Sequence, residues 1–126
     1  MIVGIGSDVI QISRIEKAAK KWGDRFLNRV FNQKEILYSQ SKKDWAASLA
    51  ARFAAKEACA KALGTGINKG VNWQHIYVTR ERGSAPVINL KGNAKKIADD
   101  LKVKRIFVTL SHDNDIAFAV VILEAL

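Results

Sequence analysis

Cysteine, methionine and proline are the scarcest residue types of this chain, which has one of each among its 126 residues. The single cysteine, Cys59, has no partner for an internal disulfide, so the fold does not depend on an oxidising compartment. Long hydrophobic runs are also missing, because the longest, IAFAVVIL at 116–123, is far shorter than the roughly 20 residues that span a bilayer. MIVGIGSD at the start lacks the basic and apolar segments of a secretory signal. We therefore expect a cytoplasmic protein with no membrane partner.

Acidic residues are few relative to basic ones: 12 Asp and Glu stand against 21 Lys and Arg, a formal net charge of +9. This excess favours an anionic partner, which is nucleic acid, an acidic protein or a phosphorylated small molecule. Nucleic acid has no further support, because the chain has no zinc finger, RNP-like aromatic sequence or convincing helix-turn-helix. We expect no nucleic-acid partner.

The length and composition predict one domain, residues 1–126, with a single core. Hydrophobic residues make up 48% of the chain and charged residues 26%, which is typical of a globular protein. No repeat or low-complexity tract divides it.

The first part of the chain predicts a short strand at 2–8 that ends at Asp8, then a helix at 14–22 that stops at Gly23. Ser13 and Glu16 have the spacing of a capping box for this helix. Its expected apolar face has helical spacing and consists of Ile15, Ala18, Ala19 and Trp22. A separate cationic stripe consists of Arg14, Lys17 and Lys21, continued by Arg25 and Arg29.

A short helix at 33–39 and a long alanine-rich helix, capped by Asp44 and ended by Gly64, are expected next. Two β-type segments follow at 75–81 and 85–90, with Pro86 at a strand start or edge. A helix at 94–101 precedes a hairpin of 105–112 and 116–125. The fold class is α+β, an antiparallel sheet packed against one long helix.

The last segment, 116–125, is apolar at both even and odd positions. Both of its faces then favour burial, which a small domain with few helices does not supply by itself. We expect a homo-oligomer.

Glu57 and Lys61 lie one turn apart on the long helix, the favoured orientation for an exposed ion pair worth roughly 0.2–0.5 kcal/mol. Taken alone, this spacing favours the ion pair over a catalytic role. Asp8, taken alone, favours an Asx-type turn that satisfies nearby backbone amides. Together, however, Asp8 and Glu57 form the sparse carboxylate pair that suffices for Mg²⁺ when phosphates complete its shell.

Ser111, His112 and Asp113 invite comparison with a hydrolase triad. Neighbouring strand residues point to opposite faces, so Ser111 and His112 are poorly placed as nucleophile and base. His75 has no companions at zinc spacing. We therefore disfavour a hydrolase and a zinc site.

Several stretches together resemble the holo-acyl-carrier-protein synthases, the small 4′-phosphopantetheinyl transferases. GIGSDVIQISRI resembles the first signature of this family and RFAAKEACAKALGTGI, at 52–67, resembles the second. GSAPVINLKG and LSHDNDIAFAVVIL also fit, so the resemblance covers nearly the whole chain. The chain departs from the family at Gln11, where an acid is frequent, and at Gly83, which lies one place early before Pro86.

The resemblance implies transfer of 4′-phosphopantetheine from coenzyme A to a serine of acyl carrier protein, in support of fatty acid biosynthesis. It implies Asp8 and Glu57 as Mg²⁺ ligands, Lys61 as the active-site lysine, and homotrimers with coenzyme A in clefts between subunits. For the serine proton, Glu57 is the candidate acceptor, either directly or through a metal-bound water. The acidic carrier would dock on a basic first helix, here on Arg14, Lys17, Lys21 and Arg25. Candidate coenzyme A contacts are Lys42, Lys43, Arg52, Lys61, Gly64, Pro86, Ser111 and His112.

Two other classes of protein remain open. A basic binding module would bind an acidic protein or nucleic acid without metal and independently of Glu57. A metal-dependent hydrolase of coenzyme A-like diphosphates would need a base for water, which nothing in the chain identifies.

Overall fold

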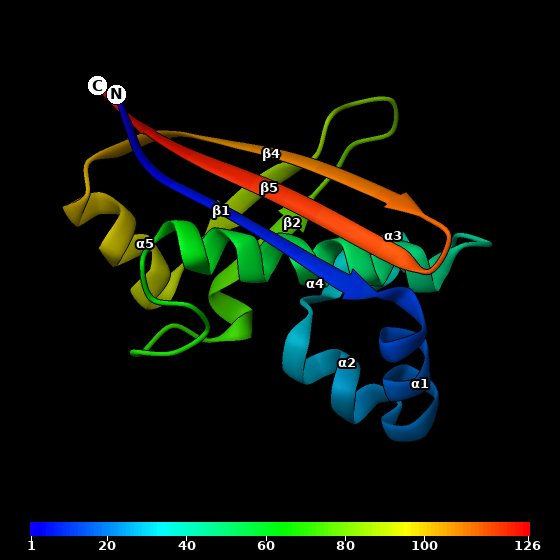
Figure 1. The fold of residues 1–126 in the computed structure, drawn as a ribbon. Coiled ribbons are helices and arrows are strands. Elements are labelled where there is room, and N and C mark those ends of the chain that lie inside the picture. Colours follow the sequence, from blue (N-terminus) through cyan, green and yellow to red (C-terminus); the bar gives the residue numbers. More distant parts are fainter.

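The computed structural model describes all 126 residues, which form two small sheets and five α-helices (Figure 1). None of the helices combines the length and hydropathy that crossing a bilayer requires. The elements in chain order are β1 (Ile2–Gln11), α1 (Ile12–Trp22), α2 (Asp24–Val30), α3 (Gln33–Gln40), α4 (Trp45–Ala62), the short 3₁₀ helix η1 (Trp73–His75), β2 (Ile76–Thr79), β3 (Val87–Leu90), α5 (Gly92–Asp100), β4 (Val103–Asp113) and β5 (Ile116–Ala125).

The main sheet is antiparallel, with β5 in the centre and β1 and β4 as the two edge strands. Its long strands cross over α4, while α1 and α2 lie on the opposite side of that helix (Figure 1). β2 and β3 form a separate two-stranded hairpin. The predicted α+β class and the helix packed on an antiparallel sheet are confirmed.

The contact between β1 and α4 is a close approach of two backbones. A Cβ atom at Gly6 would lie 2.0 Å from the Ala58 carbonyl oxygen, and one at Gly4 would lie 2.2 Å from that of Ala62. Both positions therefore need glycine. Since alternate strand residues share a face, Asp8 occupies the next position on the helix-facing side of β1.

The predicted capping box of the first helix is wrong. The helix begins at Ile12, its N-cap is Gln11, and no side chain of the N-cap residue caps it. Instead, Asp115 in the turn between β4 and β5 accepts hydrogen bonds from the Ser13 amide (2.9 Å) and the Ser13 hydroxyl (2.7 Å). A carboxylate from 102 residues along the chain thus satisfies the helix start.

Other boundaries differ in smaller ways. β1 continues through Asp8 to Gln11, and β2 and β3 are shorter than expected. Asp44 is the N-cap of α4, although its side chain makes no cap hydrogen bond. The predicted end of α4 is confirmed, because Gly64 follows the C-cap with a φ of +90°.

One face of the main sheet is covered by α4 and the other is open. Along β5, Ala117, Ala119, Val121 and Leu123 are fully buried. Large apolar side chains remain exposed on the opposite face: Ile5, Val9, Phe107, Ile116 and Phe118. We call this set the open face. A single chain therefore buries only one side of its last strand.

We expect Gly6→Ala to destabilise the protein by about 3 kcal/mol or more, at or beyond the upper end of ordinary overpacking, because the added methyl meets backbone rather than a movable side chain. Urea unfolding followed by circular dichroism measures the loss. Ser7→Ala, which changes the neighbouring residue on the other face, is the control and should have little effect. Equal stability of Gly6→Ala and the parent would contradict this account of the contact.

Candidate functional site

Asp8 and Lys61 meet where β1 crosses the second half of α4. The Lys61 ammonium lies 3.2 Å from Asp8 Oδ1 and donates to the Ser7 carbonyl at 3.0 Å. The Asp8 side chain is 17% exposed and that of Lys61 is 51% exposed. The expected Asx turn at Asp8 does not occur, because the residue lies within β1 and pairs with Ala119.

Glu57 lies half-buried beside this pair. Burial and, next, the negative charge of Asp8 raise its pKa, while Lys61 lowers it. The Glu57–Lys61 ion pair that the spacing alone favours does not form, because Lys61 turns to Asp8 instead. The structure thus brings Asp8, Glu57 and Lys61 to one place.

This donor set suits a hard divalent cation. Two carboxylates that repel one another are stabilised by a cation between them, and Mg²⁺ accepts one or two carboxylates with phosphate oxygens and water. No cluster of three or more His, Cys, Asp or Glu side chains is present, so a metal with a full protein cage does not fit.

A second group of candidates surrounds a cavity of about 260 Å³ between α3, α4 and β4. Four predicted coenzyme A contacts line it: Lys42, Arg52, Ser111 and His112. Among the other lining residues, Tyr38, Ser48 and Arg80 were not predicted as contacts, and the carboxylate of Asp44 also borders the cavity. The sequence gives little indication of these three residues, since Tyr38 lies on α3, Ser48 on α4 and Arg80 directly after β2. We call this cavity the cationic cavity.

Arg52 is the most informative residue of the cationic cavity. Its guanidinium lies 4.3 Å from the Tyr38 ring centre, and its Nη1 donates to the Ser48 carbonyl (3.2 Å) and hydroxyl (2.9 Å). Arg52 is 3% exposed, yet its buried Nε and Nη2 have no partner. Burial lowers its pKa, against the opposing effects of Tyr38 and Glu35. An unsatisfied buried cation of this kind is suited to an anionic ligand.

No hydrogen bond joins Ser111 to His112, and His112 instead lies 3.9 Å from Asp44. Lys43, Gly64 and Pro86 do not line the cationic cavity. Asp8 belongs to edge strand β1 and Ser111 to the opposite edge strand β4. Asp8, Glu57 and Lys61 therefore form one group of predicted site residues, and Lys42, Arg52, Ser111 and His112 form another at the cationic cavity.

The predicted carrier-docking residues Arg14, Lys17, Lys21 and Arg25 are all exposed. Trp22 was expected on the apolar face towards the core, and this prediction is wrong. Its side chain is 52% exposed, and the Lys21 ammonium lies 4.9 Å from its ring centre. Trp22, Arg25, Phe26 and Arg29 surround a hollow of about 350 Å³, so the basic surface also offers apolar contact.

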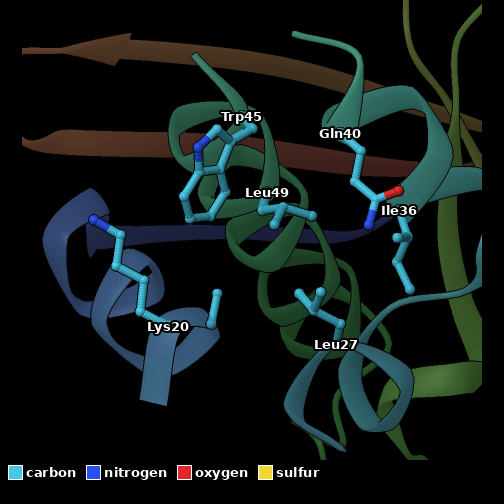
Figure 2. Close-up of a pocket in the computed structure, with 7 residues that line it drawn as sticks. Lys20, Leu27, Ile36, Gln40, Trp45 and Leu49 are labelled. Atoms are coloured by element: carbon cyan, nitrogen blue, oxygen red, sulfur yellow. The ribbon is translucent and has the colours of Figure 1, made fainter. Parts of the chain in front are cut away.

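A separate hollow of about 290 Å³ lies between α1, α2, α3 and α4 (Figure 2). It is mainly apolar, lined by Leu27, Ile36, Trp45 and Leu49, with Lys20 and Gln40 beside them (Figure 2). Trp45 borders this hollow and is only half-buried. It has no carboxylate and no group of cations for phosphate chemistry.

Comparison with known proteins agrees with this geometry. The sequence profile of the 4′-phosphopantetheinyl transferase superfamily matches residues 4–121. The chain is 48% identical over 130 residues to the holo-[acyl-carrier-protein] synthase of Brucella ovis, covering 100% of this chain and 97% of the relative.

Solved structures give the same result. The chain matches the Helicobacter pylori holo-[acyl-carrier-protein] synthase in complex with coenzyme A with a TM-score of 0.83 and 36% identity, covering 95% and 99% of the two chains. It matches the Neisseria meningitidis holo-[acyl-carrier-protein] synthase with a TM-score of 0.88 and 33% identity, covering 98% and 99%. The chain belongs to the holo-[acyl-carrier-protein] synthase family of the 4′-phosphopantetheinyl transferase superfamily.

Proposed function

We propose that this protein transfers 4′-phosphopantetheine from coenzyme A to a serine of apo acyl carrier protein, using Mg²⁺ held by Asp8 and Glu57. The transfer itself is the activity of the family to which the chain belongs. The observation that supports our choice of residues is the meeting of Asp8, Glu57 and Lys61. The setting that we propose is cytoplasmic fatty acid biosynthesis.

The reaction needs no nucleophile from the enzyme, because the carrier serine supplies it. The serine oxygen bonds to the phosphorus that bears pantetheine, the bond from that phosphorus to the bridging oxygen breaks, and adenosine 3′,5′-bisphosphate leaves with the electron pair. When bound, Mg²⁺ neutralises charge on the diphosphate. Lys61 stabilises, by its own charge, the negative charge that develops on the 5′-phosphate of the leaving group. Glu57 accepts the serine proton directly or through water.

We assign the cationic cavity to the nucleotide end of coenzyme A. The unsatisfied nitrogens of Arg52, with Lys42 and Arg80, offer charge-assisted hydrogen bonds to phosphate, and Ser111 and His112 complete the wall. Lys43, Gly64 and Pro86 remain candidate contacts outside this cavity.

We infer that the complete site forms between subunits of a homotrimer. The two groups of site residues lie along opposite edge strands, and the open face lies between them. A hollow of about 570 Å³ connects Lys61 to Phe118 and Val120, so a neighbour covering the open face also borders Lys61. Such a neighbour supplies its own cationic cavity to the site.

The exposed cations Arg14, Lys17, Lys21 and Arg25 form the docking surface that we propose for the acidic carrier. Trp22 adds an apolar anchor within this surface. Electrostatic attraction then speeds the encounter, and the tryptophan contributes contact area. Because β1 leads into α1 without a loop, docking on α1 places the carrier near Asp8.

The central test is a mass measurement of apo carrier protein after incubation with the enzyme and coenzyme A. We expect the carrier to gain the mass of one phosphopantetheine when Mg²⁺ is present, and no gain with EDTA. Asp8→Ala and Glu57→Ala should each lower the rate by about 100-fold or more while the fold is retained.

Each competing class gives a different result in this assay. A binding module leaves the carrier mass unchanged, and a hydrolase releases phosphopantetheine without a carrier. Full activity of Asp8→Ala or Glu57→Ala would contradict the metal assignment.

We expect Phe118→Glu to produce monomers, because a charge at the centre of the open face opposes its burial against a second chain. Sedimentation at micromolar concentration distinguishes monomer from trimer. Lys96→Glu on α5 also introduces a glutamate, at an exposed position away from the open face; it is the control and should stay trimeric. A monomeric parent protein would disprove the oligomer.

Mixing two inactive variants tests whether the site draws on two chains. Co-expressed Glu57→Ala and Arg52→Ala chains should recover roughly a quarter of the parent activity at low coenzyme A, since each site of a ring takes one of these residues from each of two neighbours. Steady-state rates of the purified mixture measure the recovery. If both residues serve a site within one chain, mixing restores nothing.

A further inference from the structure

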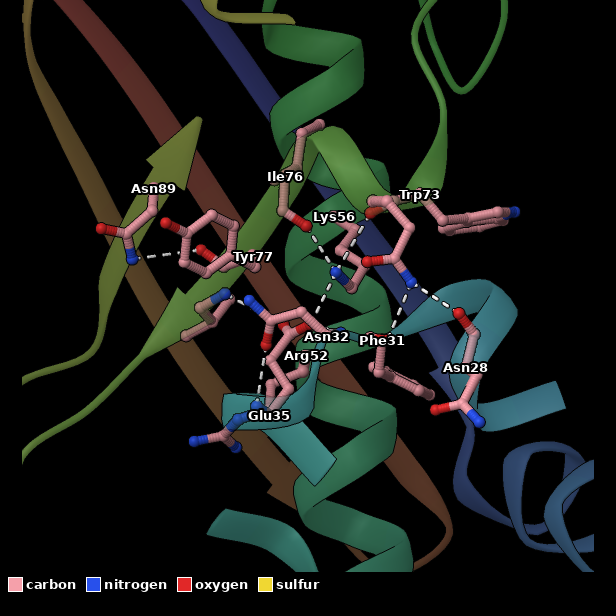
Figure 3. Close-up of polar contacts among 12 residues, drawn as sticks. Asn28, Phe31, Asn32, Glu35, Arg52, Lys56, Trp73, Ile76, Tyr77 and Asn89 are labelled. Carbon is pink, nitrogen blue, oxygen red and sulfur yellow. Dashed lines mark hydrogen bonds and ion pairs between the residues drawn. The ribbon is translucent and has the colours of Figure 1, made fainter. Parts of the chain in front are cut away.

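Glu35 of α3 and Lys56 of α4 form an ion pair in the interior of the protein. The Lys56 ammonium lies 2.7 Å from Glu35 Oε1, and both side chains are 0% exposed (Figure 3). Neither residue lines the cationic cavity or approaches Asp8. The reaction described above makes no direct use of this pair.

Every polar atom of the pair has a partner. Besides Glu35, Lys56 donates to the carbonyls of Trp73 and Ile76. Glu35 Oε1 also accepts from the Asn32 amide at 3.0 Å, and its Oε2 accepts from the Val78 amide at 2.9 Å. The pair is thus tied to backbone groups of three other segments.

The contacts with Ile76 and Val78 fall on one edge of β2. Consecutive residues of a strand direct their N–H and C=O groups to opposite edges, so Ile76 and Val78 use the same edge, and β2 has a strand partner, β3, on one edge only. Glu35 and Lys56 supply hydrogen-bond partners for the backbone groups on the other edge, as a second strand would. They therefore fix the hairpin of β2 and β3 to α3 and α4.

Three residues of this network, Glu35, Lys56 and Val78, lie close along the chain to residues that line the cationic cavity. Glu35 precedes Tyr38 by one helical turn, Lys56 follows Arg52 by one turn, and Val78 lies two residues before Arg80. Tyr38, Arg52 and Arg80 all line the cavity. One buried pair thus sets the relative positions of three cavity walls.

Stability alone does not account for such a pair. Desolvation of two buried charges offsets most of their attraction, and well-packed apolar residues of similar volume often serve the fold equally well. What apolar residues do not reproduce is the set of directed bonds to Asn32, Ile76 and Val78. The pair gives the fold a fixed geometry at this place.

We propose that Glu35 and Lys56 are positioning residues. They hold Tyr38, Arg52 and Arg80 in the arrangement that binds the nucleotide end of coenzyme A. This inference rests on the proposed function. The two residues touch no ligand and act through the three cavity residues. Their loss should weaken the use of coenzyme A while leaving the docking of the carrier intact.

The main test uses the double variant Glu35→Leu with Lys56→Met, which removes both charges of the ion pair together, so that neither member is left buried without the other. We expect it to fold, with a KM for coenzyme A raised roughly 10-fold because the cavity walls are displaced, and with the KM for the carrier and kcat within about twofold of the parent. Glu35→Gln, a single isosteric change, should raise the same KM in the same direction.

The control is Leu123→Ala, a core change on β5 beside Gly4 and remote from the cationic cavity. It lowers stability without touching the network, so its KM for coenzyme A should remain that of the parent. An unchanged KM in the folded double variant would overturn the proposal, as would an equal rise in Leu123→Ala.

Amide hydrogen exchange gives a second readout that does not depend on activity. In Glu35→Gln and in the double variant, the Val78 amide should exchange faster than in the parent, and faster than in Leu123→Ala at equal global stability. Unchanged protection of Val78 would contradict the holding role. A parent enzyme that transfers nothing to any carrier would instead refute the proposed function, and the exchange result would still decide whether the pair fixes the hairpin.

Discussion

The backbone contact between β1 and α4 determines where the two carboxylates that we propose as metal ligands can lie. Gly4 and Gly6 have no side chains, so the strand can approach the helix very closely. A Cβ atom at either position would collide with the carbonyl oxygen of Ala62 or Ala58, respectively. Asp8 is the next residue on the same face, so it reaches the side chains at the end of α4 directly. The strand signature and the helix signature are thus two halves of one packing arrangement.

Much of this arrangement was predictable from local patterns. Alanine content, helical spacing and the C′ glycine predict α4, and two apolar β-type segments separated by a short polar turn predict the closing hairpin. The start of α1 was not predictable in this way, because its cap comes from Asp115 at the far end of the chain. Ser13 and Glu16 have the spacing of a capping box, but spacing says nothing of a competing tertiary carboxylate.

The candidate site was predictable to a similar degree. Asp8, Glu57 and Lys61 follow from the two signatures, and the structure brings them together. The division of the remaining candidates between two edges of the sheet was not predictable, since it depends on the strand order. Trp22 has helical spacing with Ile15, yet the spacing does not reveal that Trp22, at the end of the helix, remains 52% exposed.

Arg52 and Lys56 lie one turn apart on α4 and show how partners decide the role of a buried cation. Burial lowers the pKa of both, and Glu35 opposes this for both. Lys56 has three acceptors for its three protons, so nothing remains for a ligand. Arg52 has two nitrogens without acceptors and faces a cavity. The unpartnered cation is suited to bind an anion, whereas the fully partnered one is suited to hold the structure around it.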